Sequence, residues 1–168
     1  MKWTRSELLR KSNSITFDED VQIDPSAFAG NSRITAAEDV HVSGTCWLDE
    51  ETDMVYAELE IDGVMICPDA ITDLPIEVPF ETSTEETYAF EPSDDDAVRY
   101  ADNEVIELLP AVIDAILLEV PLQVTEAAEG EYPEGDGWKV YTEAEYQESR
   151  KDQIDPRLAI LKQFNNEQ

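Results

Sequence analysis

Apolar and polar residues alternate over most of the stretch from residue 33 to residue 80, and this period of two is typical of half-buried β-strands. The clearest runs are Val40–Leu48, Val55–Ile61 and Leu74–Phe80. In the first run, His41 and Trp47 fall on the face opposite the apolar residues. The run therefore predicts a strand with one buried and one solvent-facing side.

Turn signals separate these runs. The acidic stretch Asp49–Asp53 predicts a turn between the first two strands. Asp62-Gly63 lies between two apolar segments, which is the strongest short signal for a β-hairpin. Pro75 and Pro79 cannot donate to a neighbouring strand, so they predict an edge strand. Shorter strands are expected near residues 15–23 and 84–90, which together give an antiparallel β meander whose strand order and closure into a barrel are left open.

One helix is expected to pack against this meander. Apolar residues recur at three- and four-residue steps, the spacing of a single helical face. Pro110 suits the first turn, and Pro121 ends the helix because it lacks the N–H that the next turn needs. The apolar stripe consists of Leu109, Val112, Ile113, Ile116, Leu117 and Val120.

Short helices are predicted at both ends. Thr4-Arg5-Ser6-Glu7 matches a capping box and starts a helix that runs to about Lys11. Asp155-Pro156 provides an N-cap and a first-turn proline for a last helix, and Glu143–Lys151 could form a polar one. We therefore predict an α+β fold with a single domain over residues 1–168, and flexible acidic loops near 91–97 and 126–137.

The net charge of the chain limits the classes of partner that it can bind. It holds 40 acidic and 11 basic residues, a formal net charge of −29, and such a surface repels phosphate backbones and attracts cationic partners. The bases gather near the two ends. They either pack terminal helices onto the acidic body or form a small patch that contacts RNA. The candidate basic contacts are Lys2, Arg5, Arg10, Lys11 and Arg157.

Catalytic chemistry has little support. His41 is the only histidine, and no P-loop, GxGxxG, HExxH or CxxC motif is present. Cys46 and Cys67 are expected to be buried, reduced thiols. We expect no enzyme activity, no metal and no cofactor.

The stretch Glu91–Asp96 is expected to form a strongly acidic loop. It lacks the glycine and the oxygen ligands of an EF-hand, so a solvated loop that meets a basic partner is the better interpretation. Its candidate contact residues are Glu91, Asp94, Asp95 and Asp96. The charged N-terminus lacks the apolar core of a signal peptide, and the longest apolar helix is too short to cross a bilayer, so a cytoplasmic protein without a membrane partner is expected.

Several segments, in this order, resemble the YceD/YlbN family. They are Met1-Lys2-Trp3, the strand Gly63–Cys67 followed by Leu74-Pro75-Ile76, the block Glu104–Pro121, and the ending Ile154–Leu161. The most specific motif is Asp155-Pro156-Arg157-Leu158. The resemblance covers nearly the whole chain and implies a role in the accumulation of 23S ribosomal RNA, in a family whose genes commonly neighbour that of a small basic ribosomal protein of the large subunit.

The chain departs from the family at its cysteines. Family members often have a C-x-x-C pair at the segment matching Cys67, and Ala70 stands at the second position here. The cysteines that many relatives carry before the final Asp-Pro-Arg are also missing. A single thiolate cannot replace a four-ligand zinc shell, so we expect no metal in this member.

The function that follows is a non-catalytic factor that supports 23S rRNA accumulation or large-subunit assembly by binding a basic ribosomal protein or a precursor particle, with local rRNA contact. Arg157 either reaches RNA or forms a structural salt bridge. Two alternatives stay open at this point: an acidic mimic of nucleic acid that inhibits a nucleic-acid-binding enzyme, and an acidic surface that only reflects adaptation to a salty cytoplasm.

Overall fold

A computed structural model describes residues 1–126, 134–139, 141, 146 and 148. The chain divides into two compact units, Met1–Thr125 and Glu126–Gln168. A single domain over residues 1–168 stays a prediction.

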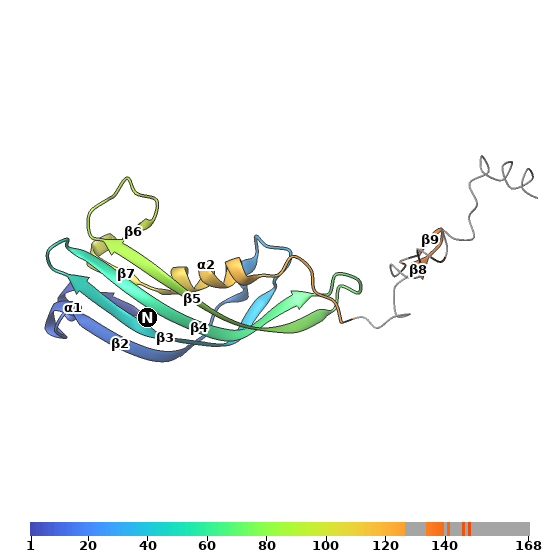
Figure 1. Ribbon diagram of the computed structural model, residues 1–168, viewed down its shortest axis with the longest axis horizontal. Coiled ribbons are helices and arrows are strands. Elements are labelled where there is room, and N and C mark those ends of the chain that lie inside the picture. The colour runs from blue at the N-terminus through green and yellow to red at the C-terminus, as the bar shows by residue number, and fades with distance from the viewer. Residues whose placement is uncertain (127–133, 140, 142–145, 147, 149–168) are drawn as a thin grey trace, which may run out of the picture. The chain divides into compact units, whose positions relative to one another are not determined.

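A five-stranded sheet dominates the first unit (Figure 1). The strands lie in sequence order, β2-β3-β4-β5-β6. The first four pair antiparallel, whereas the short β6 lies parallel to the end of β5. The strands are β2 (Ser14–Val21), β3 (Ala36–Asp49), β4 (Met54–Pro68), β5 (Pro75–Ala89) and β6 (Val98–Tyr100).

The predicted α+β class is confirmed, and so is the antiparallel meander from β2 to β5. The sheet does not close into a barrel, a point that the sequence left open. Within the first unit, β2 pairs only with β3, and β6 pairs only with β5, so the sheet is open at both edges. Along most of β5, from Pro75 to Glu86, β4 is the only paired neighbour, which agrees with the edge position predicted from Pro75 and Pro79.

The period of two in the sequence reappears as two different faces of this sheet. Directly paired residues of neighbouring strands point to the same side, so each strand contributes alternate residues to each face. The inner face carries buried apolar residues such as Val42, Leu59 and Ile61, none more than 1% exposed. His41 and Trp47 lie on the opposite face, as predicted.

Gly44 allows the strands to approach closely at the inner face. A Cβ atom at this position would overlap the carbonyl oxygen of Glu58, and the Phe17 ring already fills the adjoining space. A side chain is therefore excluded here, although the neighbouring inward positions of β3 carry valine and cysteine.

The hairpin predicted at Asp62-Gly63 is wrong, because β4 continues through both residues to Pro68. The partner strand β3 bulges between Glu38 and His41, with Asp39 at a φ of 49°. A Cβ at Gly63 would lie 3.1 Å from the carbonyl oxygen of Glu38. The glycine therefore permits a close approach at a bulge and does not form a turn. The turn predicted at Asp49–Asp53 does connect β3 to β4.

Helices and a small two-stranded ribbon pack against the core side of the sheet. The ribbon pairs β1 with β7, and buried residues of the helices join the strand residues in one hydrophobic cluster. These elements are β1 (Lys2–Thr4), α1 (Arg5–Arg10), η1 (Pro25–Phe28), η2 (Asp102–Glu104), β7 (Val105–Glu107) and α2 (Leu109–Glu119).

The signals that predicted where the two α-helices begin and end are confirmed. In α1, the Glu7 N–H donates to the Thr4 hydroxyl, and the Thr4 N–H donates to the Glu7 carboxylate at 2.8 Å, which completes the capping box. In α2, Pro110 occupies the first turn, and the helix ends before Pro121.

Helix α2 contacts β5 and belongs to the core, but its buried side differs from the predicted stripe. Its fully buried residues are Ala111, Val112, Ala115 and Ile116. Ile113 and Leu117 are only half-buried, although they still pack against the core, and Val120 of the stripe is buried. Its place as the central element of the whole fold stays a prediction.

Among the described residues of the second unit, β8 (Glu134–Gly135) pairs antiparallel with β9 (Trp138–Lys139), and the two are joined through Gly137 at a φ of 85°. The polar helix expected at Glu143–Lys151 lies almost entirely outside the described residues, and the helix expected from Asp155 lies wholly outside them. None of the helices in the described ranges is long and apolar enough to cross a membrane.

Candidate protein-interaction surface

The face of the sheet opposite the core, here called the outer face, is lined by polar and charged side chains. Strand register places them in rows across β2, β3, β4 and β5. The members are Ser14, Thr16, Asp18 and Asp20 of β2, His41, Ser43, Thr45 and Trp47 of β3, Tyr56, Glu58, Glu60 and Asp62 of β4, and Glu81, Ser83, Glu85 and Thr87 of β5.

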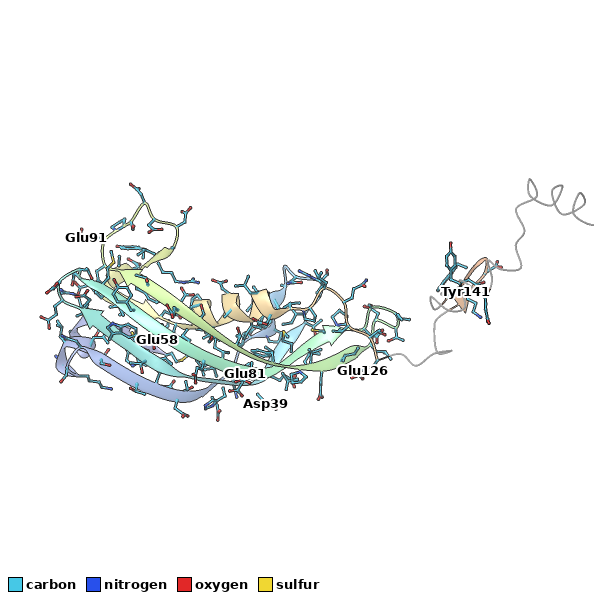
Figure 2. All side chains as sticks on the ribbon, in the orientation of Figure 1. Asp39, Glu58, Glu81, Glu91, Glu126 and Tyr141 are labelled. Carbon is cyan, nitrogen blue, oxygen red and sulfur yellow. The ribbon has the colours of Figure 1, made fainter. Side chains whose placement is uncertain are left out.

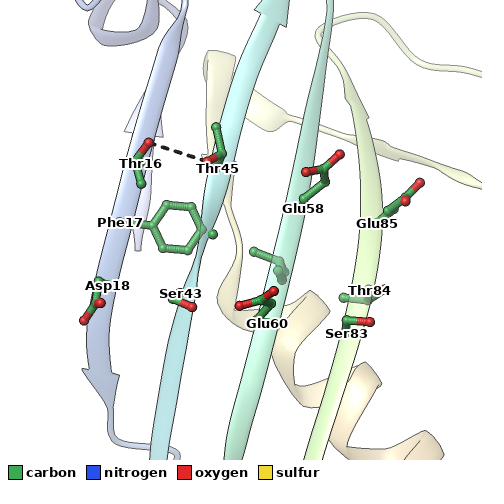
Figure 3. A pocket seen from close by; sticks show the side chains of 12 residues that line it. Thr16, Phe17, Asp18, Ser43, Thr45, Glu58, Glu60, Ser83, Thr84 and Glu85 are labelled. Carbon is green, nitrogen blue, oxygen red and sulfur yellow. Dashed lines mark hydrogen bonds between the residues drawn. The ribbon is translucent and has the colours of Figure 1, made fainter.

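Part of this face is hollowed into a shallow depression of about 610 Å³ (Figure 3). Helix α2 lies behind the strands in this view, so the depression opens away from it. Hydroxyls of β2, β3 and β5 line it, among them those of Thr16 and Thr45, whose oxygens lie 3.5 Å apart. Carboxylates of Asp18, Glu58 and Glu60 stand around them. The surface therefore offers many hydrogen-bond acceptors beside negative charge.

Like charges face one another across the strands of the outer face. Glu58 pairs in register with Glu85, and Asp62 pairs with Glu81. Directly opposed like charges destabilise a sheet by up to about 1 kcal/mol per pair. No lysine or arginine lies among the outer-face residues to offset them. The arrangement therefore costs stability that a cationic partner would restore.

His41 is the one group on this face that can become cationic. Its Nδ1 lies 2.9 Å from an oxygen of Asp20, and its Nε2 lies 3.4 Å from Asp18. The hydrogen bond to Asp20 is the main cause of a raised His41 pKa, and the charges of Asp18 and Asp62 act in the same direction. A protonated His41 would therefore offset negative charge at this corner of the outer face.

An aromatic pair lies at the other end of the outer face from His41, next to the row that contains Glu58. Trp47 and Tyr56 are paired in register, with ring centroids 5.8 Å apart and planes inclined by 27°. Both side chains are half-exposed. Tyr56 lies two residues before Glu58 on the same strand, so a ring and a carboxylate point out of the sheet about 7 Å apart. Such a combination suits cations with a flat face.

The structure gives two of the predicted basic contacts partners within the fold. Lys2 lies 2.9 Å from Glu107, which joins β1 to β7. Arg5 donates to Asp53, and its guanidinium lies 5.5 Å from the centroid of the Phe90 ring. The hydrogen bond with Asp53 raises the pKa of Arg5.

Arg10 and Lys11 are placed differently. They lie exposed at the end of α1, and neither forms an ion pair with a described residue. They are the two described candidates whose charge faces solvent unpaired. RNA contact at any of the four N-terminal positions stays a prediction. Arg157, with the rest of the motif Asp155, Pro156 and Leu158, lies outside the described residues.

The predicted acidic loop connects β5 to β6 and is exposed at Glu91, Asp94, Asp95 and Asp96 (Figure 2). Asp95 shapes the loop itself, because its carboxylate accepts the N–H of Ala97 at 3.0 Å. No pair of these acids is placed in register by a strand. The loop carries charge, but it lacks the ordered spacing of the outer face, and its contact with a basic partner stays a prediction.

Arg99 of β6 is a structural cation. Its Nε lies 2.7 Å from Glu86, and its Nη2 lies 2.7 Å from Asp114. It therefore ties β6 to β5 and to α2. The hydrogen bond with Glu86 is the main cause of a raised Arg99 pKa.

Both cysteines are buried and free, as predicted. Burial raises the pKa of the Cys46 thiol to about 12 and also raises that of Cys67. Ala70, at the position of the second cysteine of the family pair, donates its N–H to the Val124 carbonyl at 2.9 Å. Within the described ranges, no three His, Cys, Asp or Glu side chains gather as metal ligands.

The outer face was not predicted from the sequence, because the strands were identified by the apolar residues of each alternating run. The signal was present in the intervening positions. Glu58, Glu60 and Asp62 are spaced two apart in one run and must share a face if that run is a strand. Their neighbours on β2 and β5 could not be assigned without the register.

Comparisons with known proteins give the chain its family. No solved structure matches it. The uncharacterised protein YlbN of Bacillus subtilis (strain 168) is 35% identical over 172 residues, covering 98% of this chain and 96% of that protein. The family model described as "Large ribosomal RNA subunit accumulation protein YceD" matches residues 57–165. The resemblance noted in the sequence is thus confirmed, and the chain belongs to the YceD family.

Proposed function

We propose that this protein is a non-catalytic ribosome-biogenesis factor that supports 23S rRNA accumulation and large-subunit assembly. The family description supports a ribosome-related role. The outer face supports binding of a basic large-subunit ribosomal protein, alone or within a precursor particle. Ribosomal proteins are cationic because they contact RNA, so a surface of ordered carboxylates complements them.

The single observation that carries this mechanism is the pairing of like charges across the sheet. Glu58 opposes Glu85, and Asp62 opposes Glu81, without an intervening base among the described residues. A surface that only needed to be soluble would gain stability from mixed signs. Ordered acids on a rigid sheet also lose little entropy on binding, unlike acids on a mobile segment.

The exposed bases of α1 provide a second, smaller contact. Arg10 and Lys11 lie at the end of the helix and could reach rRNA phosphates of the same particle. The acidic area excludes broad RNA contact, so RNA binding by the isolated protein should be weak.

Affinity purification of the tagged protein from growing cells tests the proposal. Retained proteins and RNA are identified at low and at moderate salt. Large-subunit ribosomal proteins or precursor 23S rRNA that are lost as salt rises would support the proposal, because charge pairing is screened by salt. Recovery of no ribosomal material at either salt would contradict it.

A second candidate function is an acidic mimic of nucleic acid. The regular spacing of carboxylates on the outer face favours it over a merely solubilising surface. Such a mimic would retain a nuclease or another nucleic-acid-binding enzyme in the same purification. Inhibition of that enzyme by the purified protein would then replace the ribosomal proposal.

A further inference from the structure

We propose that the outer face recognises an extended, arginine-bearing segment of its partner, with one guanidinium held between the Trp47–Tyr56 rings and the carboxylate of Glu58. This inference rests on the proposed function in one respect, that the partner is a basic protein. It adds the conformation of the bound segment and a preference for arginine over lysine.

The arginine preference follows from the two neighbouring rows at this end of the face. The stacked rings of Trp47 and Tyr56 are half-exposed, and Glu58 lies two residues from Tyr56 on the same side. A guanidinium is planar, so it can stack on a ring while its edge donates two hydrogen bonds to a carboxylate. A lysine ammonium is a compact point charge and cannot do both in this geometry.

The extended conformation follows from the spacing of the acids. Glu58, Glu60 and Asp62 are alternate residues of one strand, so their side chains repeat about every 7 Å. An extended peptide that runs along β4 repeats its own side chains at the same interval. A helix repeats one face about every 5.4 Å and would lose this match after one turn.

The surface between these acids suits a backbone as well as side chains. Ser43 and Ser83 stand on either side of Glu60 in the same row and carry hydroxyls, which both donate and accept hydrogen bonds. They line the depression seen in Figure 3. A peptide that lies in this depression can therefore satisfy its N–H and C=O groups.

The outer face is open within the first unit. Glu58, Glu60 and Asp62 are exposed, and no lysine or arginine of the described residues pairs with them. A second copy of the chain that docked its own outer face here would bring negative charge against negative charge, so the repulsion excludes a symmetric face-to-face pair as the occupant.

Binding of two peptides to the purified full chain tests the inference. One alternates arginine with serine, and the other alternates lysine with serine at the same length and charge. We expect the arginine peptide to bind about twofold to fivefold more tightly, since a cation stacked on a ring contributes about 0.5–1 kcal/mol at an exposed site. Fluorescence anisotropy of labelled peptides at low salt gives both affinities.

Variants of the aromatic row locate the effect. Tyr56→Phe keeps the ring and should keep the arginine preference. Tyr56→Thr together with Trp47→Thr retains strand-forming residues and should bind the two peptides equally while still binding both. Thermal unfolding of each variant confirms that the fold persists.

Three outcomes would overturn the inference: equal affinities of the two peptides for the unchanged protein, an arginine preference that survives in the double threonine variant, or displacement of the arginine peptide by equimolar spermidine, which would assign the surface to polyamines. Its failure is separable from that of the proposed function. Ribosomal capture from cells without an arginine preference leaves the proposed function standing, whereas an arginine preference without ribosomal capture leaves only the peptide-binding surface.

Discussion

The two faces of one sheet have opposite tasks in this protein. Leu59 is 1% exposed and packs in the core, while its neighbours Glu58 and Glu60 point to solvent. The inner face increases the free energy of unfolding by removing apolar area from water. The outer face carries charges that repel one another and so decrease the free energy of unfolding. The same strand therefore stabilises the fold with one set of side chains and presents a recognition surface with the other.

Removal of an inner-face side chain should have the largest effect on stability. Leu59→Ala deletes buried methyl groups and leaves a cavity, so we expect the free energy of unfolding to fall by about 2–5 kcal/mol. Urea unfolding followed by circular dichroism measures it. Glu60→Ala, one residue away on the outer face, is the matched control and should change stability little. Similar losses in both variants would contradict the division between the faces.

The link between the sheet and α2 should have the next largest effect. Arg99→Met removes the cation that bridges Glu86 and Asp114, and it leaves the carboxylate of Glu86, only 14% exposed, without its partner. We expect a loss of about 1–3 kcal/mol in the free energy of unfolding. Lys2→Met breaks the exposed pair with Glu107 and should cost about 1 kcal/mol or less. Equal costs at these two positions would argue against a structural role for Arg99.

Neutralising the outer face should act in the opposite direction. The triple change Glu58→Gln, Glu60→Gln and Asp62→Asn removes two opposed like-charge pairs and should raise the free energy of unfolding by about 0.2–1 kcal/mol per pair at low salt. The gain should shrink as salt screens the charges in the unchanged protein. Thermal melts at several salt concentrations measure both effects. A less stable triple variant would show that these carboxylates support the fold.

The smallest effect is expected from His41. Its raised pKa in the folded chain means that the pairs with Asp20 and Asp18 add stability below the pKa of the unfolded chain, about 6.5. This contribution is lost as the pH rises through the folded pKa, because the imidazole then becomes neutral. The difference in melting temperature between the unchanged protein and His41→Gln should therefore be present at about pH 5 and absent at about pH 9. A difference that persists at the higher pH would contradict a charge effect.

Much of the fold was predictable because it depends on local chemistry. The capping box of Thr4 and Glu7, the proline limits of α2 and the alternation within β3 and β4 each need only a few neighbouring residues. Asp62-Gly63 was misassigned because a hairpin glycine and a bulge-facing glycine look the same in sequence. The bulge belongs to another strand, more than twenty residues earlier.

The candidate site was less predictable. A run of adjacent acids such as Asp94–Asp96 is conspicuous in a sequence, but it lies on a loop without register. The acids of the outer face come from β2, β4 and β5, and only strand pairing brings them together. The sequence did limit the partner, since a net charge of −29 already favoured a cationic one.

The most direct test of the account compares this ordered surface with the loop. The outer-face variant Glu58→Gln, Glu60→Gln, Asp62→Asn and the loop variant Glu91→Gln, Asp94→Asn, Asp96→Asn remove the same charge and spare Asp95, which shapes its turn. Each is tagged and used to capture ribosomal proteins and precursor rRNA from cells at low salt. The account predicts loss of capture by the outer-face variant and near-normal capture by the loop variant. Equal capture by both variants, or loss only in the loop variant, would contradict the claim that the outer face is the binding surface.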